Sequence, residues 1–100
     1  MPRAQAIDKL NAESIRGWLR GRKGWKRRSN QLTKEFEFPG FRDSIVFVNR
    51  VATLADDYDH HPDIDVRYDV VTITLSTHDA GGVTELDVRL AEAMDKLAGA

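Results

Sequence analysis

The sequence predicts an α+β domain with a four-stranded antiparallel sheet and three helices packed largely on one face, in the order α-β-β-α-β-β-α. Two observations lead to this prediction. Apolar residues recur at helical spacing in three segments, near residues 11–20, 41–58 and 84–97. Between these segments lie short runs rich in β-forming residues, separated by turn-forming residues. Pairs of strands alternating with single helices are typical of α+β folds that carry their helices on one face of the sheet.

The first helix is expected to run from about residue 11 to residue 20. Asn11 is a favourable N-cap, and Ile15 and Leu19 lie one helical turn apart. Gly21 and Gly24 then end the helix, because glycine readily adopts the left-handed conformation that follows a last turn.

Two strands are expected next, over residues 25–28 and 32–38, joined by a turn at residues 29–30. In the second strand Leu32, Phe36 and Phe38 share one face. Lys34 interrupts this apolar row.

The longest periodic segment, residues 41–58, predicts a helix that is covered on more than one side. It carries two apolar rows: Ile45, Val48, Ala52 and Ala55, and Phe47, Val51, Leu54 and Tyr58. Packing on a sheet needs only one apolar stripe. We therefore interpret the second row as a possible subunit interface.

The region after this helix predicts a break, a bend and a further strand. Pro62 disfavours helical geometry in the residue before it, so the helix should stop before His61. Apolar residues then change parity between Val70 and Val71, which a regular strand does not allow. A turn or bulge is expected near residues 69–70, followed by a strand over 71–77 with His78 on its polar side.

The last helix is expected from Thr84 to about Leu97. Thr84 is the N-cap, and Asp87 occupies the position of the acidic partner in a capping box. The expected buried stripe consists of Leu86, Leu90, Ala93 and Leu97.

Length and composition predict one domain over residues 1–100, with its core in about 11–97. The chain has no cysteine, which excludes disulfides, thiolate nucleophiles and cysteine-ligated zinc. No apolar run approaches the roughly 20 residues that span a bilayer, and the first residues lack the apolar stretch of a secretory signal. A cytoplasmic protein without membrane contact is therefore expected.

The charges are unevenly distributed along the chain. Residues 1–34 hold ten Lys or Arg and two Asp or Glu, and residues 35–100 hold five and fourteen. The basic segment around Trp25 allows a nucleic-acid patch or an ordinary solvated hairpin anchored by its tryptophan. We favour the hairpin and expect no nucleic-acid partner, because the acidic remainder would repel a polyanion.

The three histidines of the chain are His60, His61 and His78, and aspartates surround the first two. Nearby carboxylates favour the protonated imidazolium, which suits histidines to proton transfer at neutral pH. Three interpretations remain open: surface or capping histidines, a metal site and acid/base catalysis in a cleft. A metal site is the least favoured, because neighbours in an extended segment point to opposite sides.

The histidine motif resembles the signature of the pterin-4a-carbinolamine dehydratases. It consists of Asp56, His60-His61-Pro62, Tyr68 and His78, at fixed spacing. The resemblance extends over about residues 11–97, including the run HHPDIDVRYDVVTITLSTHDAGGVTELD. One departure is Ile64, where the family often has an aromatic residue that would stack on a pterin.

This resemblance implies a lyase that dehydrates 4a-hydroxytetrahydropterin to quinonoid dihydropterin, with no metal and no cofactor. The catalytic residues would be His60, His61 and His78, with His60 and His78 as the proton-transfer pair and His61 mainly binding substrate. The substrate would also contact Asp59, Ser76, Thr77 and Asp79. Possible supporting residues are Asp56, which could orient His60, and Asp87, for which helix capping is a sufficient explanation.

The resemblance also implies association of subunits. Dimers would join through sheet edges, and the 41–58 helix would pack dimers into a tetramer. A non-catalytic alternative follows from the same family: some relatives serve as a dimerisation cofactor for a protein partner.

Overall fold

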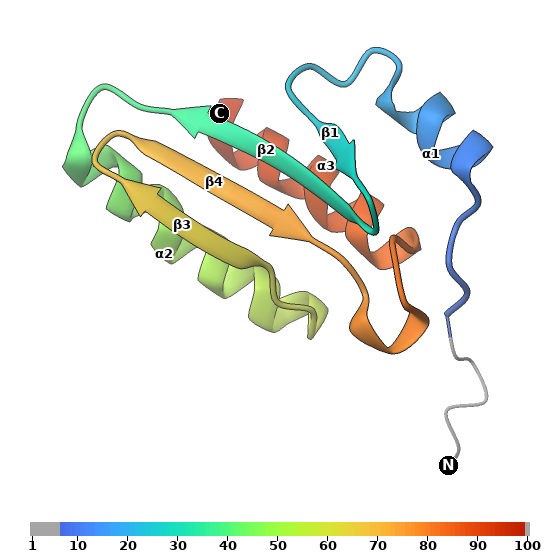
Figure 1. The fold of residues 1–100 in the computed structure, drawn as a ribbon. Coiled ribbons are helices and arrows are strands. Elements are labelled where there is room, and N and C mark those ends of the chain that lie inside the picture. Colours follow the sequence, from blue (N-terminus) through green and yellow to red (C-terminus); the bar gives the residue numbers. More distant parts are fainter. Residues whose placement is uncertain (1–6, 100) are drawn as a thin grey trace.

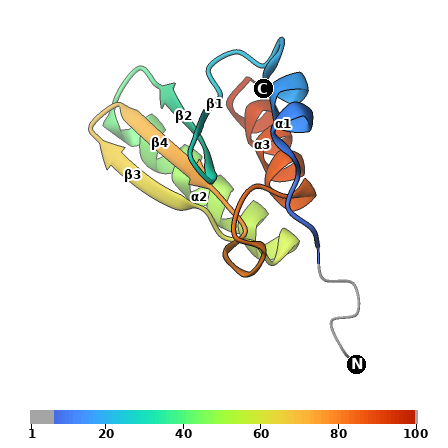
Figure 2. The same cartoon turned by 45° about the vertical axis from the view of Figure 1, so that its right-hand side comes forward.

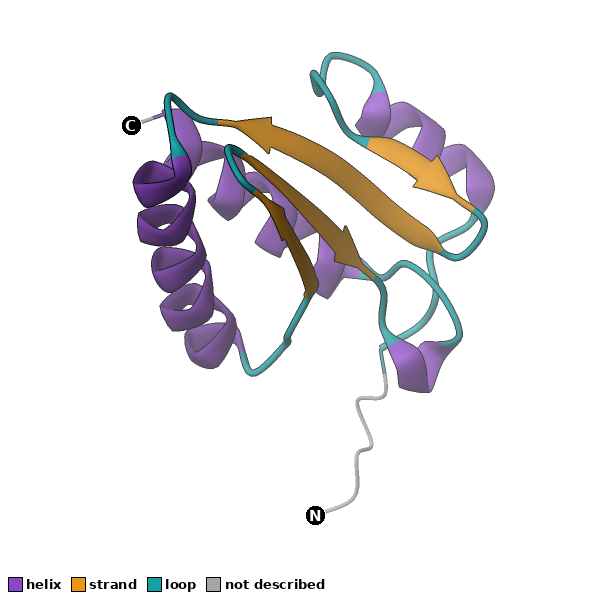
Figure 3. Cartoon of the chain, turned by 60° about the vertical axis from the view of Figure 1, so that its left-hand side comes forward, coloured by secondary structure: helices purple, strands orange, loops and turns teal. Residues whose placement is uncertain are grey.

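The computed structural model describes residues 7–99 and confirms the α+β fold with its predicted order (Figure 1). Its elements are α1 (Ala12–Leu19), β1 (Lys26–Arg28), β2 (Gln31–Glu37), α2 (Phe41–Tyr58), β3 (Asp63–Arg67), β4 (Val70–Leu75), the short 3₁₀ helix η1 (His78–Ala80) and α3 (Glu85–Gly99). Figure 3 shows helices and strands in separate colours, with the sheet open to the viewer.

The four strands are antiparallel and follow the order β1-β2-β4-β3. Across the central pair, Leu32 faces Leu75 and Phe36 faces Val71. Because directly opposed residues lie on the same face, the register gathers the apolar side chains of both strands on one side of the sheet. The other side carries mainly polar residues, such as the hydrogen-bonded pair Thr33 and Thr74 at 3.3 Å.

The helices lie on one side of the sheet, over its apolar face (Figures 1 and 2). Helices α2 and α3 pack against each other and the sheet, and α1 lies beside α3. The buried apolar cluster consists of Ile15, Trp25, Leu32, Phe36, Phe47, Val51, Val71, Ile73, Leu75, Val83, Val88, Leu90, Ala91 and Met94.

The basic N-terminal part of the chain is tied to acidic residues of α3. The indole N–H of Trp25 lies 3.0 Å from Asp95 Oδ2, and the Lys34 ammonium donates to Asp95 Oδ1 at 2.7 Å. Arg22 pairs with Glu92 at 2.9 Å. The break that Lys34 makes in the apolar row of β2 therefore serves a contact between β2 and α3, and the buried Trp25 anchors the basic hairpin.

Helix α2 has the predicted bounds, but its burial differs from the two predicted rows. The buried residues are Ser44, Phe47, Val51 and Ala55, which form a single stripe. Of the first predicted row, Ala55 is buried, Ile45 and Val48 are half-buried and Ala52 is exposed, so this row is only partly covered within the domain. Among residues 7–99, no helix is long and apolar enough to cross a membrane.

Three local predictions need correction. In α3, three of the four residues of the predicted buried stripe are only half-buried: Leu86, Ala93 and Leu97. The apolar residues buried there are Val88, Leu90, Ala91 and Met94. The difference arises because α2, α1 and the sheet contact this helix on more than one side. The turn between β3 and β4 lies at residues 68–69, one position earlier than predicted. Strand β4 ends at Leu75, and His78 belongs to η1 instead of continuing the strand.

Candidate active site

His60 lies at the end of α2, with its ring turned into the domain. Helix α2 closes at Asp59, which has a left-handed backbone with φ 51°, and the His60 N–H donates to the carbonyl of Ala55 at 3.0 Å. The His60 side chain is only 12% exposed, and its Nε2 lies 2.6 Å from Oδ1 of Asp87. The turn that ends α2 thus directs an imidazole onto a carboxylate in the first turn of α3.

Asp87 is fully buried and receives several hydrogen bonds. Its Oδ2 accepts the backbone N–H of Thr84 and the hydroxyl of Thr77, both at 2.8 Å. The Thr84 hydroxyl lies 2.7 Å from the Thr77 oxygen. Because the single Thr77 proton goes to Asp87, Thr84 must be the donor to Thr77. The predicted capping contact of Asp87 is therefore present, and the same carboxylate also binds His60.

The contact with Asp87 fixes which nitrogen of the His60 ring carries the proton when the ring is neutral. An ionised carboxylate only accepts hydrogen bonds, so Nε2 of His60 carries a proton and donates it to Asp87. The neighbouring Nδ1 is then the ring atom left to exchange a proton with another molecule. A carboxylate that holds a histidine in one tautomer and orientation is a common support for proton transfer and metal binding.

His61 points elsewhere and is largely exposed. Its Nε2 lies 2.9 Å from Oδ1 of Asp56, and the two side chains are 60% and 74% exposed. Asp56 thus contacts His61, and the carboxylate in contact with His60 is that of Asp87. An exposed pair of this kind contributes little to stability and leaves the His61 ring accessible.

His78 opens η1 and is exposed beside a cavity of about 290 Å³. The Thr77 N–H donates to the Gly82 carbonyl at 2.8 Å, which closes the loop that carries His78. The cavity is lined by Ser29, Asn30, Gln31, Ser76, Thr77, His78, Gly81 and Gly82. Of the four further residues predicted to contact the substrate, Ser76 and Thr77 line this cavity, whereas Asp79 and Asp59 are exposed and do not line it.

Thr77 connects the two halves of the site. It lines the cavity beside His78, and its hydroxyl donates to the carboxylate that holds His60. The end of α2, η1 and the start of α3 gather at one end of the molecule (Figure 1). His60 and His61 themselves are not among the residues that line the cavity.

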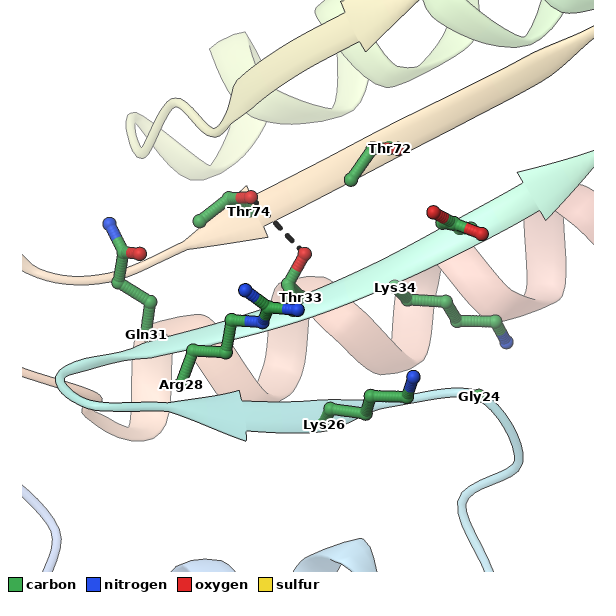
Figure 4. Close-up of a pocket in the computed structure, with 9 residues that line it drawn as sticks. Gly24, Lys26, Arg28, Gln31, Thr33, Lys34, Thr72 and Thr74 are labelled. Atoms are coloured by element: carbon green, nitrogen blue, oxygen red, sulfur yellow. Dashed lines mark hydrogen bonds between the residues drawn. The ribbon is translucent and has the colours of Figure 1, made fainter.

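A hollow of about 550 Å³ lies on the open face of the sheet, and no histidine lines it. Figure 4 shows Lys26 and Arg28 of β1 facing it beside Thr33, Thr72 and Thr74. It lacks the histidine side chains whose ordinary pKa lies nearest neutral pH.

The described residues offer little to a metal ion. No group of three or more potential histidine or carboxylate ligands occurs among residues 7–99. Ile64, the residue that departs from the resembled family pattern, is 37% exposed near the start of β3, opposite the buried Ile73.

Sequence reasoning missed two contributions to the site. The first is the hydroxyl network of Thr77 and Thr84, for which the capping spacing of Thr84 and Asp87 was the available signal. The second is the turn between β1 and β2, which brings Ser29 and Asn30 to the cavity. Nothing in the local sequence of that turn indicates a ligand, because the sheet register alone brings it beside the end of β4.

Comparisons with known proteins agree on one family. The family model described as pterin 4 alpha carbinolamine dehydratase matches residues 8–97. A relative from Sulfurisphaera tokodaii, provisionally named a pterin-4-alpha-carbinolamine dehydratase, is 44% identical over 91 residues, which cover 91% of this chain and 98% of the relative.

Two solved structures resemble the fold as well. The crystal structure of a transcriptional coactivator/pterin dehydratase from Brucella melitensis superposes with a TM-score of 0.88 at 34% identity, covering 92% of this chain and 100% of that one. A pterin dehydratase-like protein described as a RuBisCO assembly factor of the alpha-carboxysome gives a TM-score of 0.64 at 26% identity, covering 76% and 88%.

Proposed function

We propose that this chain, which belongs to the pterin 4 alpha carbinolamine dehydratase family, dehydrates 4a-hydroxytetrahydropterin by histidine acid/base catalysis. The product is quinonoid dihydropterin, and the reaction would return a spent pterin cofactor toward its reduced form.

The reaction requires two proton transfers on one substrate. An acid protonates the hydroxyl on C4a, the C4a–O bond breaks, and water leaves. A base takes the proton from N5 as its electron pair forms the C4a=N5 double bond. One proton enters and one leaves, so no net oxidation occurs and no redox partner is needed. General acid/base groups in such a step contribute about 10² to 10⁴-fold in rate.

We assign these transfers to His60 and His78. With Nε2 of His60 committed to Asp87, its Nδ1 accepts a proton when the ring is neutral and donates one when it is charged, so either role uses the same atom. His78 is exposed at the cavity and free to meet the substrate from another element. His61, accessible and backed only by Asp56, serves mainly to bind the pterin.

The cavity beside His78 suits a small heterocycle. Its volume of about 290 Å³ lies at the lower end for small-molecule sites, which fits a bicyclic ring better than a large ligand. Its lining supplies hydroxyls of Ser76 and Thr77 and the amides of Asn30 and Gln31. Such donors and acceptors match the amide and amine edge of a pterin.

The observation that carries the proposal is the 2.6 Å contact between His60 and the fully buried Asp87. A buried carboxylate that serves only as a helix cap does not need a histidine partner. Thr77 links the His60–Asp87 pair to the cavity beside His78, which is the third histidine of the chain.

The proposal predicts that the purified protein accelerates loss of the 4a-carbinolamine. The carbinolamine is generated by a hydroxylase reaction and its absorbance is followed in a stopped-flow instrument. We expect micromolar protein to shorten the lifetime of the intermediate well below that in buffer. A lifetime equal to that with a heat-inactivated sample would refute the enzymatic function.

We also propose that copies of the chain associate through α2 and a sheet edge. Val46 on α2 is 45% exposed and Phe41 is 51% exposed, and Ile45 and Val48 beside them are only half-buried. Burial of such a surface in an assembly of a small domain adds hydrophobic stabilisation that one copy lacks.

Replacing Val46 with aspartate is expected to shift the protein toward smaller species, because a charge on this face would lose its hydration on association. Light scattering after gel filtration measures the mass of wild type and variant. Ser14→Asp, on the exposed surface of α1, tests whether any added charge has the same effect. A wild-type mass of one chain would contradict the proposed assembly.

The exposed face of α2 also favours a second candidate function, a protein-binding role. The Brucella neighbour is described as a transcriptional coactivator and the carboxysome neighbour as an assembly factor. Such a role would survive replacement of all three histidines, whereas the dehydratase activity would not.

A further inference from the structure

We infer that the cavity beside His78 continues into a cationic subsite, formed by Lys9 and Arg27, that binds an anionic group at the end of the pterin side chain. This inference rests on the proposed function, because it assigns the pterin ring to the His78 cavity. It specifies the class of substrate: reduced pterins whose C6 substituent ends in a phosphate or carboxylate.

The two spaces are neighbours with a shared wall. A second cavity of about 210 Å³ lies next to the first and is lined by Lys9, Leu10, Asn11, Ala12, Ile15, Arg27, Ser29, Asn30, Gly82 and Val83. Three of these residues, Ser29, Asn30 and Gly82, also line the cavity beside His78. A substituent on a pterin ring bound in the first cavity therefore has to pass only these three residues to reach the second cavity.

The second cavity is positively charged. Lys9 and Arg27 line it, and no aspartate or glutamate does. Within residues 7–99, neither cation forms an ion pair with a carboxylate, whereas Arg22, Lys34, Arg67 and Arg89 each do. An anion entering this cavity would meet two cations without having to displace a carboxylate.

Local contacts hold both cations at the shared wall. The Arg27 Nε donates to the carbonyl of Ser29 at 3.0 Å, which leaves its two terminal nitrogens to bind a ligand. Opposed to Leu32 across the β1–β2 pair, Arg27 lies on the helix-covered face of the sheet. A guanidinium restrained in this way suits two parallel hydrogen bonds to a phosphate.

Gly82 makes room for Lys9. A Cβ atom at Gly82 would lie 2.7 Å from Cδ of Lys9, so any larger residue there would force the lysine stem to move. The hydrogen bond from the Leu10 N–H to the Val83 carbonyl, at 2.8 Å, fixes the segment that carries Lys9. The stem therefore lies over Gly82, in the wall that the two cavities share, and Lys9 lines the second cavity.

The test compares two carbinolamine substrates that differ only in the side chain, one ending in a hydroxyl and one in a phosphomonoester. We expect wild type to favour the phosphomonoester in kcat/KM by about tenfold, a usual size for charge-assisted contacts that are partly exposed. Arg27→Gln and Lys9→Gln should each reduce this preference several-fold, mainly through KM, and added salt should reduce it in wild type.

Arg28→Gln is the matched control, because Arg28 is the next residue of β1 and faces the hollow on the opposite side of the sheet (Figure 4). It should leave the preference unchanged. Equal kcat/KM for the two substrates in an active enzyme, or an equal loss in Arg28→Gln and Arg27→Gln, would overturn the subsite alone. Failure to turn over either substrate would overturn the proposed function and the subsite with it.

Discussion

Replacing His60 or His78 with alanine is expected to lower kcat for carbinolamine dehydration by about 10² to 10⁴-fold. Each variant removes one of the two groups that exchange protons with the substrate. Because both groups act on the same elimination, the double variant should lose much less than the product of the two single losses. Stopped-flow decay of the carbinolamine measures all three rates.

The different burial of His60 and His78 predicts different results when free imidazole is added to the alanine variants. His78 is exposed, so free imidazole can enter the space left by His78→Ala, whereas the His60 side chain is only 12% exposed. We expect imidazole to restore part of the activity of His78→Ala and much less of that of His60→Ala. His61→Ala serves as the comparison and should raise KM more than it lowers kcat. A wild-type rate in either His60→Ala or His78→Ala would remove that residue from the mechanism.

Replacing Asp87 with asparagine is expected to lower kcat by about 10²-fold while the chain still folds. The amide oxygen must accept the Thr84 N–H and the Thr77 hydroxyl, so the amide NH₂ faces His60. Nε2 of His60 must then accept a hydrogen bond, which moves the ring proton to Nδ1. The substrate meets the wrong tautomer, the same effect that disables a catalytic triad when its aspartate becomes asparagine.

Asp95→Asn provides the matched control for Asp87→Asn. Asp95 also belongs to α3 and also accepts hydrogen bonds, but from Trp25 and Lys34 instead of a histidine. It should reduce stability in urea denaturation without a comparable loss of kcat. Equal kcat values in Asp87→Asn and wild type would show that Asp87 only caps α3.

The fold was predictable wherever a local signal decides the outcome. Asn11 accepts the Ser14 N–H at 2.8 Å as the N-cap of α1. Helix α2 begins after Gly40 and ends before His61, as Pro39-Gly40 and Pro62 indicate. The buried stripe of α3 was not predictable from periodicity alone. Met94 and Val88 become buried because neighbouring elements contact more than one side of that helix, a property of the packing and not of the helix.

The histidine motif was visible in the sequence, but the partner of His60 was not. Asp87 lies 27 residues away, and helix capping already explained its presence. Sequence proximity suggested Asp56 instead, because it lies one helical turn before His60. The left-handed residue Asp59 turns the chain out of the helix, so His60 points into the domain and Asp56 meets His61.

A crystal structure with a stable dihydropterin bound tests most directly the claim that His60 and His78 act on one substrate. We predict that the ring occupies the cavity beside His78, with N5 and the position of the C4a hydroxyl within hydrogen-bonding reach of Nδ1 of His60 and of the His78 ring. A pterin bound on the open face of the sheet, or a ring in the cavity that His60 cannot reach, would contradict the account.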